Sequence, residues 1–521
     1  MNTETGRTFK NLPRSFWLAS TDSTDYPSLN NDLSVNTAII GGGMAGILCA
    51  WYLKAEGLDT AILEADRIVQ GTTAHTTAKI TSQHGLIYHK IEQQRGSDLA
   101  RQYAEANEWA ITEIKKISEN NNIQCEYTPQ SAYVYTQEDK NIRKVEDEVK
   151  TASSLGIKAS YIHEIPFPIP IKAGIKFEKQ AQFHPRKFLL PLAEKLCREG
   201  VKIYENSRVV SMDIHNPYTL TTNNGIRVTA ENVIIASHYP FYNKHGMYYS
   251  RIYTERTYII AIRAHDKYPG GMYINAEEPS RSLRYCKNDN DEMILVVGEN
   301  HKTGQGKDMD RHYWALADFA EKIFSVKAIP YRWSTQDCMT LDGIPYVGQF
   351  SSDTPGLYIV AGFEKWGMTN SVASAIILKD LILRGESPWQ EVYNPSRKNL
   401  TGSVKHFVVE NLDVAKHLIG GKIVKKTEDE KVKSGEGNIA EVDRKRTGAY
   451  RDNNGNLHLV NTTCTHMGCE LNWNSAELSW DCPCHGSRFT YTGEIVEGPA
   501  VHPLSKDNDI STINKIITED F

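Results

Sequence analysis

Cysteines and histidines with the spacing of metal ligands gather near the C-terminal end of the sequence. The stretch 464–469 reads CTHMGC, and the stretch 482–487 reads CPCHGS. Two thiolates and two imidazoles can hold Zn²⁺, and they also suit a [2Fe–2S] cluster with two cysteines on one iron and two histidines on the other. A four-ligand zinc site would not need Cys469 or Cys484. The candidate metal ligands are Cys464, His466, Cys482 and His485.

Both stretches resemble the Rieske proteins of cytochrome bc-type complexes, in six residue identities and two spacings. We therefore favour a Rieske [2Fe–2S] cluster, and a zinc ribbon is the alternative. The resemblance assigns one iron to Cys464 and Cys482, the other iron to His466 and His485, and a disulfide between the two loops to Cys469 and Cys484.

Three further positions bear on this resemblance. Residues 498–500, GPA, resemble the proline loop that covers such clusters, and Ser487 matches a serine whose hydroxyl bonds a cluster sulfur. Where high-potential members carry a tyrosine that also bonds the cluster, this chain has Phe489. Because fewer hydrogen bonds to sulfur stabilise the reduced cluster less, we expect a potential below the high-potential class.

A glycine-rich stretch near the N-terminus has the spacing of a dinucleotide-binding turn. Residues 41–46 read GGGMAG, which fits G-x-G-x-x-G, between an apolar strand at 37–40 and a helix expected over 47–55. A second strand, 60–63, ends at Glu64. The motif requires this context, because the helix N-terminus attracts phosphates and the acid accepts a ribose hydroxyl. The expected roles are a tight turn at Gly41, close pyrophosphate approach at Gly43 and helix–strand packing at Gly46.

Proteins that bind NAD and proteins that bind FAD share this glycine-rich turn. The rest of the chain favours FAD. Residues 342–345 (DGIP) and 362–369 (GFEKWGMT) resemble the D-amino-acid-oxidase-like flavoproteins, the glycine oxidase and sarcosine oxidase group, in a likeness that spans roughly residues 35–385. In that group a strand leads into a helix whose N-terminus faces the flavin. The resemblance implies FAD binding by Gly41, Gly43, Met44, Ala45, Gly46, Glu64, Thr72, Thr73, His75, Val209, Gly362, Trp366, Gly367 and Met368.

The loop 71–79, GTTAHTTAK, resembles the family segment that packs over the pyrophosphate and the flavin ring. Lys79 falls where relatives place a basic residue beside the isoalloxazine, and a cation near N1 or N5 stabilises a reduced, anionic flavin. His75 aligns with a histidine that carries covalent flavin in some relatives. Ordinary loop hydrogen bonding is the alternative for both residues.

The segment 333–343, WSTQDCMTLDG, departs from relatives that bind amino acids. Those relatives hold the substrate carboxylate with an arginine where this chain has Asp337. Because an acid repels a carboxylate and attracts a cationic amine, we do not expect a simple amino acid bound by this route. A structural salt bridge is the alternative for Asp337. The candidate catalytic residues are Lys79 and Asp337.

The two parts together resemble a bacterial family of FAD-dependent, Rieske-containing oxidoreductases. Flavin relatives take a hydride from a C–H next to an amine nitrogen, so we expect an enzyme that oxidises an amine-type small molecule. It would relay electrons from FAD through the cluster to an external acceptor, as a dehydrogenase rather than an oxidase. The alternatives are reverse electron flow, a redox sensor without turnover, and a Rieske-type monooxygenase. A monooxygenase needs a second iron held by two histidines and a carboxylate. The H-x₄-H pair of the sequence is His84 and His89, but no acid stands in 78–83, so such a site would need ligands that are distant in the sequence.

The composition excludes several other classes. The 521 residues carry 59 Lys and Arg against 64 Asp and Glu, for a net charge of −5. This balance lacks the basic footprint of a nucleic-acid-binding protein. No apolar stretch is long enough to predict a membrane span, and no secretory signal is visible, so we expect a cytoplasmic protein.

The predicted fold class is α/β plus α+β, with a Rossmann-like FAD-binding domain interleaved with a mixed substrate domain and followed by a small all-β Rieske domain. Apolar residues at helical spacing predict an amphipathic helix over 97–118. Seven of nine residues in 425–433 are charged, which indicates a linker. The expected parts are an N-terminal arm (1–34), the interleaved domains (35–395), a linker with a helix (396–440) and the Rieske domain (441–521).

Overall fold

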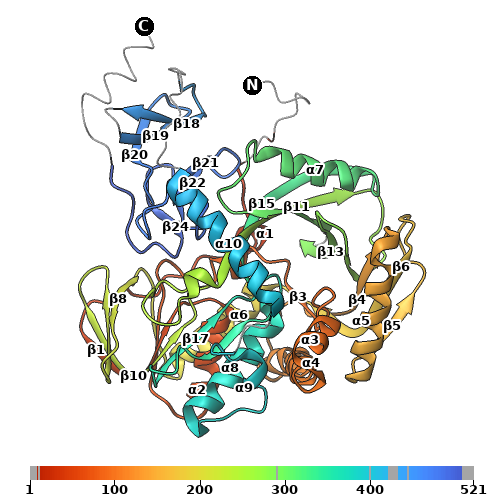
Figure 1. Cartoon of the computed structure of the whole chain (residues 1–521), viewed down its shortest axis with the longest axis horizontal. Coiled ribbons are helices and arrows are strands. Elements are labelled where there is room, and N and C mark those ends of the chain that lie inside the picture. The colour runs from red at the N-terminus through yellow and green to blue at the C-terminus, as the bar shows by residue number, and fades with distance from the viewer. Residues whose placement is uncertain are drawn as a thin grey trace.

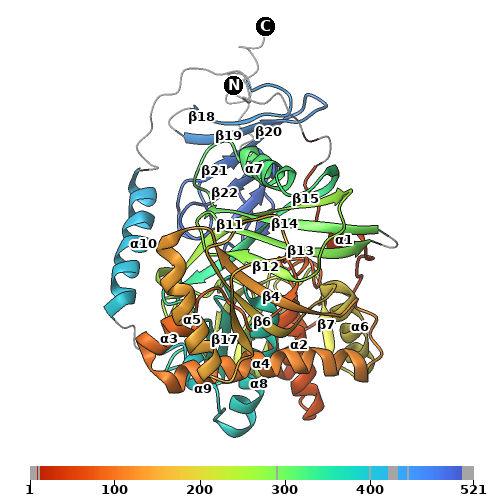
Figure 2. The ribbon, with the colours of Figure 1, turned by 90° about the vertical axis from the view of Figure 1, so that its right-hand side faces the viewer.

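The computed structural model of the chain describes residues 9, 12–288, 291–397, 401–420, 432–442 and 445–506 (Figure 1). Residues 12–397 form a body built on two large sheets, which we call the large domain. Residues 432–506 form a small domain with two small sheets, at the top of Figure 1. Helix α10 (Thr401–Gly420) runs along one side of the molecule between the two (Figure 2).

The first sheet of the large domain places several strand ends at one edge. Its central order is β16-β17-β10-β1-β2-β7, and β1 runs parallel to both β2 and β10. Ile40, the last residue of β1, pairs with Leu63 and with Ile235, the last residues of β2 and β10. The carboxyl ends of these parallel strands therefore meet, where ligands of such sheets bind. The strands are β1 (Leu33–Ile40), β2 (Thr60–Leu63), β7 (Lys202–Tyr204), β8 (Val209–Asp213), β9 (Tyr218–Thr222), β10 (Arg227–Ile235), β16 (Tyr346–Gln349) and β17 (Leu357–Ala361).

The second sheet has nine strands, in the order β15-β11-β14-β13-β12-β4-β6-β3 with β5 paired to β6. The chain passes from the first sheet to the second and back twice, so the predicted interleaving is confirmed. The strands are β3 (Lys79–Ile80), β4 (Thr128–Thr136), β5 (Ala159–Ile162), β6 (Ala173–Gln182), β11 (Ile252–Ala264), β12 (Met272–Asn275), β13 (Arg281–Asn288), β14 (Asp291–Lys302) and β15 (Val326–Thr340).

Helices cover the sheets of the large domain. Helix α2 packs against α6 and α8 and buries Ile47, Leu48 and Leu53. The predicted amphipathic helix forms as α4, which turns a face with Tyr103 and Ile114 into the core. The helices are α1 (Phe16–Ala19), α2 (Met44–Ala55), α3 (Tyr88–Arg95), α4 (Ser97–Asn120), α5 (Ile142–Ser154), α6 (Pro185–Arg198), α7 (Asp310–Glu321), α8 (Gly367–Arg384) and α9 (Gln390–Tyr393), with 3-10 turns η1 (Thr72–Ala74), η2 (Asp139–Asn141) and η3 (Tyr248–Ser250).

The small domain is all-β, as predicted. Its strands are β18 (Gly437–Val442), β19 (Lys445–Arg451) and β20 (Leu457–Asn461) in one sheet, and β21 (Asn472–Asn474), β22 (Ser479–Asp481), β23 (Arg488–Thr490) and β24 (Ile495–Glu497) in the other. Strand β18 begins inside the predicted linker, because its pairing with β19 orders residues that carry no apolar run. Most of the charged stretch 425–433 and residues 1–8, 10 and 11 of the predicted arm lie outside the described residues. Across the described residues, no helix combines the length and apolar character needed to cross a bilayer.

A buried ion pair fixes the end of the large domain. Arg397 donates from Nε and a terminal nitrogen to the two carboxylate oxygens of Asp342, each at 2.8 Å. Arg95 reaches the same carboxylate at 2.6 Å. Although burial opposes ionisation, the two arginines lower the pKa of Asp342. The pair connects the segment after α9 to the turn between β15 and β16.

We predict that Arg397→Met lowers the free energy of unfolding at pH 7 by about 3–5 kcal/mol, because it leaves a buried carboxylate short of a partner. The matched control is Arg384→Met, since Arg384 is 69% exposed and lies 3.8 Å from Asp380. The control should change stability by less than about 0.5 kcal/mol. Urea unfolding followed by circular dichroism measures both, and equal midpoints for the two variants would contradict the prediction.

Candidate functional site

The glycine-rich turn between β1 and α2 lies at the carboxyl edge of the first sheet. Gly41 has a φ of +114°, and a Cβ there would lie 2.5 Å from the carbonyl oxygen of Ala236. A Cβ on Gly46 would overlap the carbonyl oxygen of Gly41, so this glycine lets α2 start directly against the strand. Gly43 has more room, because the nearest atom to its Cβ would be Thr73 Oγ1 at 3.2 Å. The open side of the turn is therefore at Gly43 and the N-terminus of α2, where phosphates bind.

Glu64 follows β2 and orders this turn. Its carboxylate accepts the backbone N–H of Gly42 at 2.7 Å and that of Asp66 at 3.0 Å. Burial raises the pKa of Glu64, although the two N–H donors oppose the effect. Each carboxylate oxygen keeps a second lone pair, so Glu64 retains the capacity to accept a ribose hydroxyl.

One cavity of about 850 Å³ brings the predicted FAD-binding and catalytic residues together. Lys79 on β3 and Asp337 on β15 both line it, although their strands lie at opposite ends of the strand order, so the second sheet curves over the cavity. Gly46 lies behind the wall, where it packs the helix. The other predicted residues in the wall are Gly41, Gly43, Met44, Ala45, Glu64, Thr72, Thr73, His75, Val209, Gly362, Trp366, Gly367 and Met368.

A second helix N-terminus, that of α8, opens onto the same cavity. Gly362 after β17 has a φ of +74°, and a Cβ there would overlap the methyl group of Thr340. Trp366 precedes the helix and stacks on His84, with ring centroids 5.0 Å apart. The N–H groups at a helix start favour negative charge. This arrangement fits the flavin edge that the resemblance predicts there.

Lys79 reaches the cavity from the short strand β3. Its Nζ donates to the carbonyl oxygen of Tyr273 at 3.1 Å and to the hydroxyl of Ser282 at 2.5 Å. Burial and the nearby charge of Arg284 lower the pKa of Lys79 to about 7. Its amine therefore gains or loses a proton near neutral pH, a property that suits general acid–base work.

Asp337 belongs to an ion pair in the cavity wall. Its carboxylate accepts Lys365 Nζ at 2.8 Å and the hydroxyl of Thr257 at 2.7 Å. Although burial opposes it, the charges of Asp337 and Glu255 raise the pKa of Lys365. Lys365 thus neutralises the acid at neutral pH. The pair is the structural salt bridge that stood as the alternative for Asp337, and it leaves less charge to attract a cationic amine than the sequence suggested.

His84 and His89 do not assemble an iron site. Both ring nitrogens of His84 have partners, at 2.7 Å from the hydroxyl of Tyr103 and 2.8 Å from the carbonyl oxygen of Thr81. His89 lies on α3, where its Nδ1 is 3.3 Å from the hydroxyl of Thr151. Because His84 is buried with both nitrogens engaged, this histidine pair is not poised to bind iron.

The predicted metal ligands of the small domain lie on two loops. The first ligand loop, 464–469, joins β20 to β21, and the second ligand loop, 482–487, joins β22 to β23. The thiols of Cys464 and Cys482 share a hydrogen bond, which lowers the pKa of Cys464 and raises that of Cys482. The two loops therefore bring both predicted thiolate ligands to one place.

The two histidines offer ring nitrogens beside these thiols. The rings of His466 and His485 are 5.0 Å apart, and both Nδ1 atoms are buried without a hydrogen-bond partner. Burial lowers the pKa of His466 to about 4 and that of His485 to about 3, so both are neutral at pH 7. Neutral imidazole is the form that binds metal, and orphaned buried nitrogens are rare. The donor set therefore fits a Rieske cluster.

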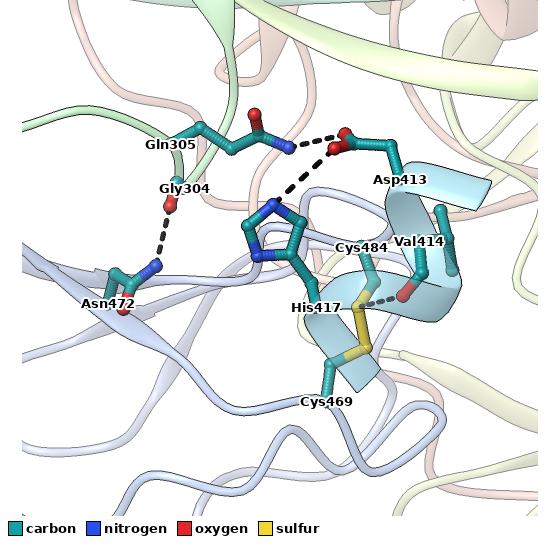
Figure 3. The surroundings of a disulfide bond; sticks show 8 residues. All are labelled: Gly304, Gln305, Asp413, Val414, His417, Cys469, Asn472 and Cys484. Atoms are coloured by element: carbon teal, nitrogen blue, oxygen red, sulfur yellow. Dashed lines mark hydrogen bonds and ion pairs between the residues drawn. A yellow bond between two sulfur atoms is a disulfide. The ribbon is translucent and has the colours of Figure 1, made fainter. Parts of the chain in front are cut away.

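Cys469 and Cys484 form the predicted disulfide between the two loops (Figure 3). Their Cα atoms are 6.5 Å apart, and Cys484 Sγ lies 4.0 Å from the carbonyl oxygen of Val414 on α10. The sulfurs of Cys469, Cys482 and Cys484 lie within 4.8 Å of one another. Two of the three are joined in the disulfide, so this sulfur group has one thiol to offer.

The proline loop is attached to the second ligand loop. The backbone N–H of Ala500 donates to Ser487 Oγ at 3.0 Å. Phe489, which stands where high-potential relatives carry a tyrosine, is fully buried. At the two positions predicted to face the cluster sulfurs, the small domain therefore has the hydroxyl of Ser487 but no tyrosine hydroxyl, because Phe489 takes the second position.

Side chains of the large domain reach the predicted cluster ligands. The sequence did not predict these contacts. The amide of Asn243 lies 2.8 Å from His466 Nε2, and the ring of Tyr249 lies 6.2 Å from that of His485. Both belong to the segment 236–251, which also lines the cavity through His238. Asn243 and His466 are 223 positions apart, and no motif connects them.

A buried ion network also crosses between the domains. Arg256 on β11 donates to Glu497 on β24 at 2.9 Å and to the hydroxyl of Ser334. Arg488 of the small domain reaches the same glutamate at 3.3 Å. Although burial opposes it, the charges of Arg256 and Arg488 lower the pKa of Glu497 to about 2.

The small domain forms part of the cavity wall. Burial lowers the pKa of His75, and the charge of Glu497 opposes this effect. Both side chains line the cavity. Because His75 is predicted to lie beside the flavin ring, the small domain meets the cavity at the predicted flavin position. Its residues in the wall are Glu477, Leu478, Ser479, Arg488, Thr490, Tyr491, Ile495, Val496, Glu497, Gly498, Pro499, Ala500 and Val501.

Comparison with known proteins agrees with both halves of this geometry. The family described as DAO, FAD dependent oxidoreductase, matches residues 36–381. The chain belongs to the FAD-dependent oxidoreductase family. It also carries a Rieske [2Fe–2S] domain, which matches residues 422–511 and rules out the zinc ribbon alternative. The cofactors are therefore FAD and a [2Fe–2S] cluster.

Individual relatives cover one or both halves. The putative Rieske 2Fe-2S iron-sulfur protein YhfW of Bacillus subtilis (strain 168) is 41% identical over 498 residues, 95% of this chain and 98% of that protein. The gamma-glutamylputrescine oxidoreductase of Escherichia coli (strain K12) is 22% identical over 404 residues, 72% of this chain and 89% of that protein. The crystal structure of glycine oxidase from Geobacillus kaustophilus shares the fold with a TM-score of 0.60 and 16% identity, covering 71% of this chain and 100% of that one.

We predict two iron atoms and no zinc per chain, because the four ligands suit one Rieske cluster. Cys482→Ser should lose the iron and retain FAD, since the cavity wall keeps its glycine turns. Cys197→Ser is the control, because Cys197 is an exposed free cysteine. Elemental analysis with visible absorption checks this prediction, and one zinc per chain in the parent protein would contradict it.

We predict that Lys79 makes stability depend on pH. The folded pKa of about 7 lies below the ordinary value of 10.5, so between these pH values the unfolded chain binds more protons. The free energy of unfolding should therefore rise with pH across this window, and the rise should shrink in Lys79→Met. Lys116→Met, at an exposed lysine, is the control. Urea unfolding at pH 7, 8, 9 and 10 measures the slopes, and parallel curves for Lys79→Met and the parent would rule this out.

Proposed function

We propose that this FAD-dependent oxidoreductase oxidises an amine-type small molecule at a C–H bond next to nitrogen and relays the electrons through its Rieske cluster to an external acceptor. The observation that carries the proposal is the shared cavity. Glu497 and Pro499 of the small domain line it together with Gly41 and Met368 of the large domain. A cavity bounded by both cofactor-binding domains suits electron transfer within one chain.

FAD supplies two-electron hydride chemistry and the [2Fe–2S] cluster supplies one-electron chemistry. Loss of a hydride from the carbon turns the amine into an iminium, and water then gives a carbonyl compound and the free amine. The amine must lose its extra proton before it gives up a hydride. Lys79 Nζ lies in the cavity wall and accepts a proton near pH 7, so we assign it this role.

The names of similar proteins support an amine substrate. The Escherichia coli relative is named for gamma-glutamylputrescine, and the structural neighbour from Geobacillus kaustophilus is named for glycine. Asp337 replaces the arginine expected to bind a carboxylate and is paired with Lys365. We therefore propose an amine whose recognition does not require a carboxylate at this position.

The Rieske domain supports a dehydrogenase rather than an oxidase. A one-electron carrier at the cavity gives the electrons a route other than molecular oxygen. We propose that the external acceptor takes single electrons from the cluster.

The relay is tested by anaerobic stopped-flow mixing with a panel of primary, secondary and N-methylated amines. A substrate should bleach the flavin absorption first and then generate the electron paramagnetic resonance signal of a reduced Rieske cluster. In Cys482→Ser the same amine should bleach the flavin without the second phase. Flavin bleaching in the parent protein with no subsequent cluster reduction would reject the relay, and no bleaching by any amine would reject the substrate class.

A further inference from the structure

The two ligand loops of the cluster differ in their exposure. Every residue of the second ligand loop, 482–487, is buried. In the first ligand loop, Thr465 is exposed and Met467 is 43% exposed. The cover of the second ligand loop comes in large part from the large domain, through three contacts.

The first contact is made by Gly304, in the turn that follows β14. Its φ is +69°, and a Cβ there would lie 2.6 Å from Pro483 N and 2.7 Å from the carbonyl carbon of Cys482. The obstacle is backbone at a predicted iron ligand, so it cannot move aside as a flexible side chain would. Asn472 of the small domain donates to the carbonyl oxygen of Gly304 at 2.8 Å, which fixes the turn (Figure 3).

The second contact mirrors the first, with the glycine on the other partner. Gly486 of the second ligand loop has a φ of +78°, and a Cβ there would lie 2.8 Å from the Cβ of Thr254 on β11. Gly304 thus brings its backbone against the backbone of the second ligand loop, and Gly486 leaves room on that loop for the side chain of Thr254.

The third contact is a hydrogen bond from the large domain to the loop backbone. Gln336 on β15 is 1% exposed, and its Nε2 donates to the carbonyl oxygen of Gly486 at 3.0 Å. Its Oε1 accepts the hydroxyl of Thr303 at 3.0 Å. Gln336 directly precedes Asp337, which lines the cavity. One strand therefore carries both a cavity residue and the residue that holds the peptide next to His485.

We propose that Thr254, Gly304 and Gln336 clamp the second ligand loop, so that the Rieske domain stays docked on the flavin cavity and does not shuttle as a mobile carrier. Gln336 is a positioning residue in this clamp. A relay between FAD and the cluster is compatible with either a fixed or a moving domain, so the clamp goes beyond the proposed function. Its consequence is a constant separation between the two cofactor sites during turnover.

The first experiment compares Gly304→Ala with Gly306→Ala in the full-length holoprotein. Both glycines have positive φ, +69° and +113°, so alanine strains the backbone at both. At 306 the new Cβ would meet, within 4 Å, the flexible end of Met309, whereas at 304 it would meet the second ligand loop. Hydrogen exchange of the amides in that loop should become at least about tenfold faster in Gly304→Ala than in Gly306→Ala, because local opening exposes them.

Equal exchange in the two glycine variants would overturn the clamp. This readout does not require electron transfer, so it separates the clamp from the relay. If the flavin of the parent protein never reduces the cluster, the proposed function is wrong. The hydrogen-exchange pattern of the second ligand loop still decides whether that loop is clamped.

The second experiment addresses Gln336 without adding bulk. Gln336→Glu is isosteric and turns a carboxylate oxygen toward the carbonyl oxygen of Gly486. Gln349→Glu is the control, because Gln349 Nε2 also donates to a backbone carbonyl, that of Ser351 at 2.7 Å, within the large domain. Both variants should retain two irons and FAD. Gln336→Glu should show at least about tenfold faster exchange in the second ligand loop and slower flavin-to-cluster transfer than the control.

A Gln336→Glu protein that matches Gln349→Glu in loop exchange would show that Gln336 does not position the loop. If Gly304→Ala fails to fold, this pair of variants decides the proposal alone. A parent protein whose loop amides already exchange as fast as those of exposed residues would also overturn the clamp.

Discussion

The arrangement of the two domains depends on a buried arginine of one domain whose ion-pair partners lie in the other. Arg256 belongs to the large domain and is 1% exposed, yet its carboxylate partner at 2.9 Å is Glu497 of the small domain. Removing one member of a buried ion pair is far more destabilising than removing a surface pair, because the remaining charge is left without compensation. Separation of the domains would expose this deficit, so the ion pair disfavours it. The same glutamate lines the cavity, so the contact between the domains also builds the cavity wall.

Charge compensation also shapes the chemistry of the cavity. Asp337 is paired with Lys365, and Glu497 is paired with Arg256, so these groups contribute little net charge to the wall. Lys79 differs because burial gives its amine a pKa of about 7. The cavity wall therefore combines compensated ion pairs with a lysine whose charge changes near neutral pH.

The lack of a Cβ in glycine allows close backbone contact both within one domain and between the two domains. Gly46 lets a helix start against a strand within the large domain, and Gly304 lets the large domain touch the backbone of the second ligand loop. In each case a Cβ would overlap backbone atoms. The first glycine was predicted from its motif, because the contact partner Gly41 is five positions away in the sequence. Gly304 carried no such signal, because its partner lies in another domain.

Motifs whose parts are close in the sequence predicted much of this protein. The turn 41–46 with Glu64 and the paired boxes at 464–469 and 482–487 follow from residue types at short spacing, and helix α4 follows from its apolar period. The disulfide follows from the family resemblance that those boxes carry. Contacts between distant segments were beyond that reasoning. Lys365 beside Asp337, Asn243 at His466 and Arg256 at Glu497 join residues whose types are common on any surface. Local spacing, together with the family resemblances of these motifs, determined which cofactors the chain can hold. Only the tertiary structure decided how the two sites face each other, because the packing of one domain on the other sets that geometry.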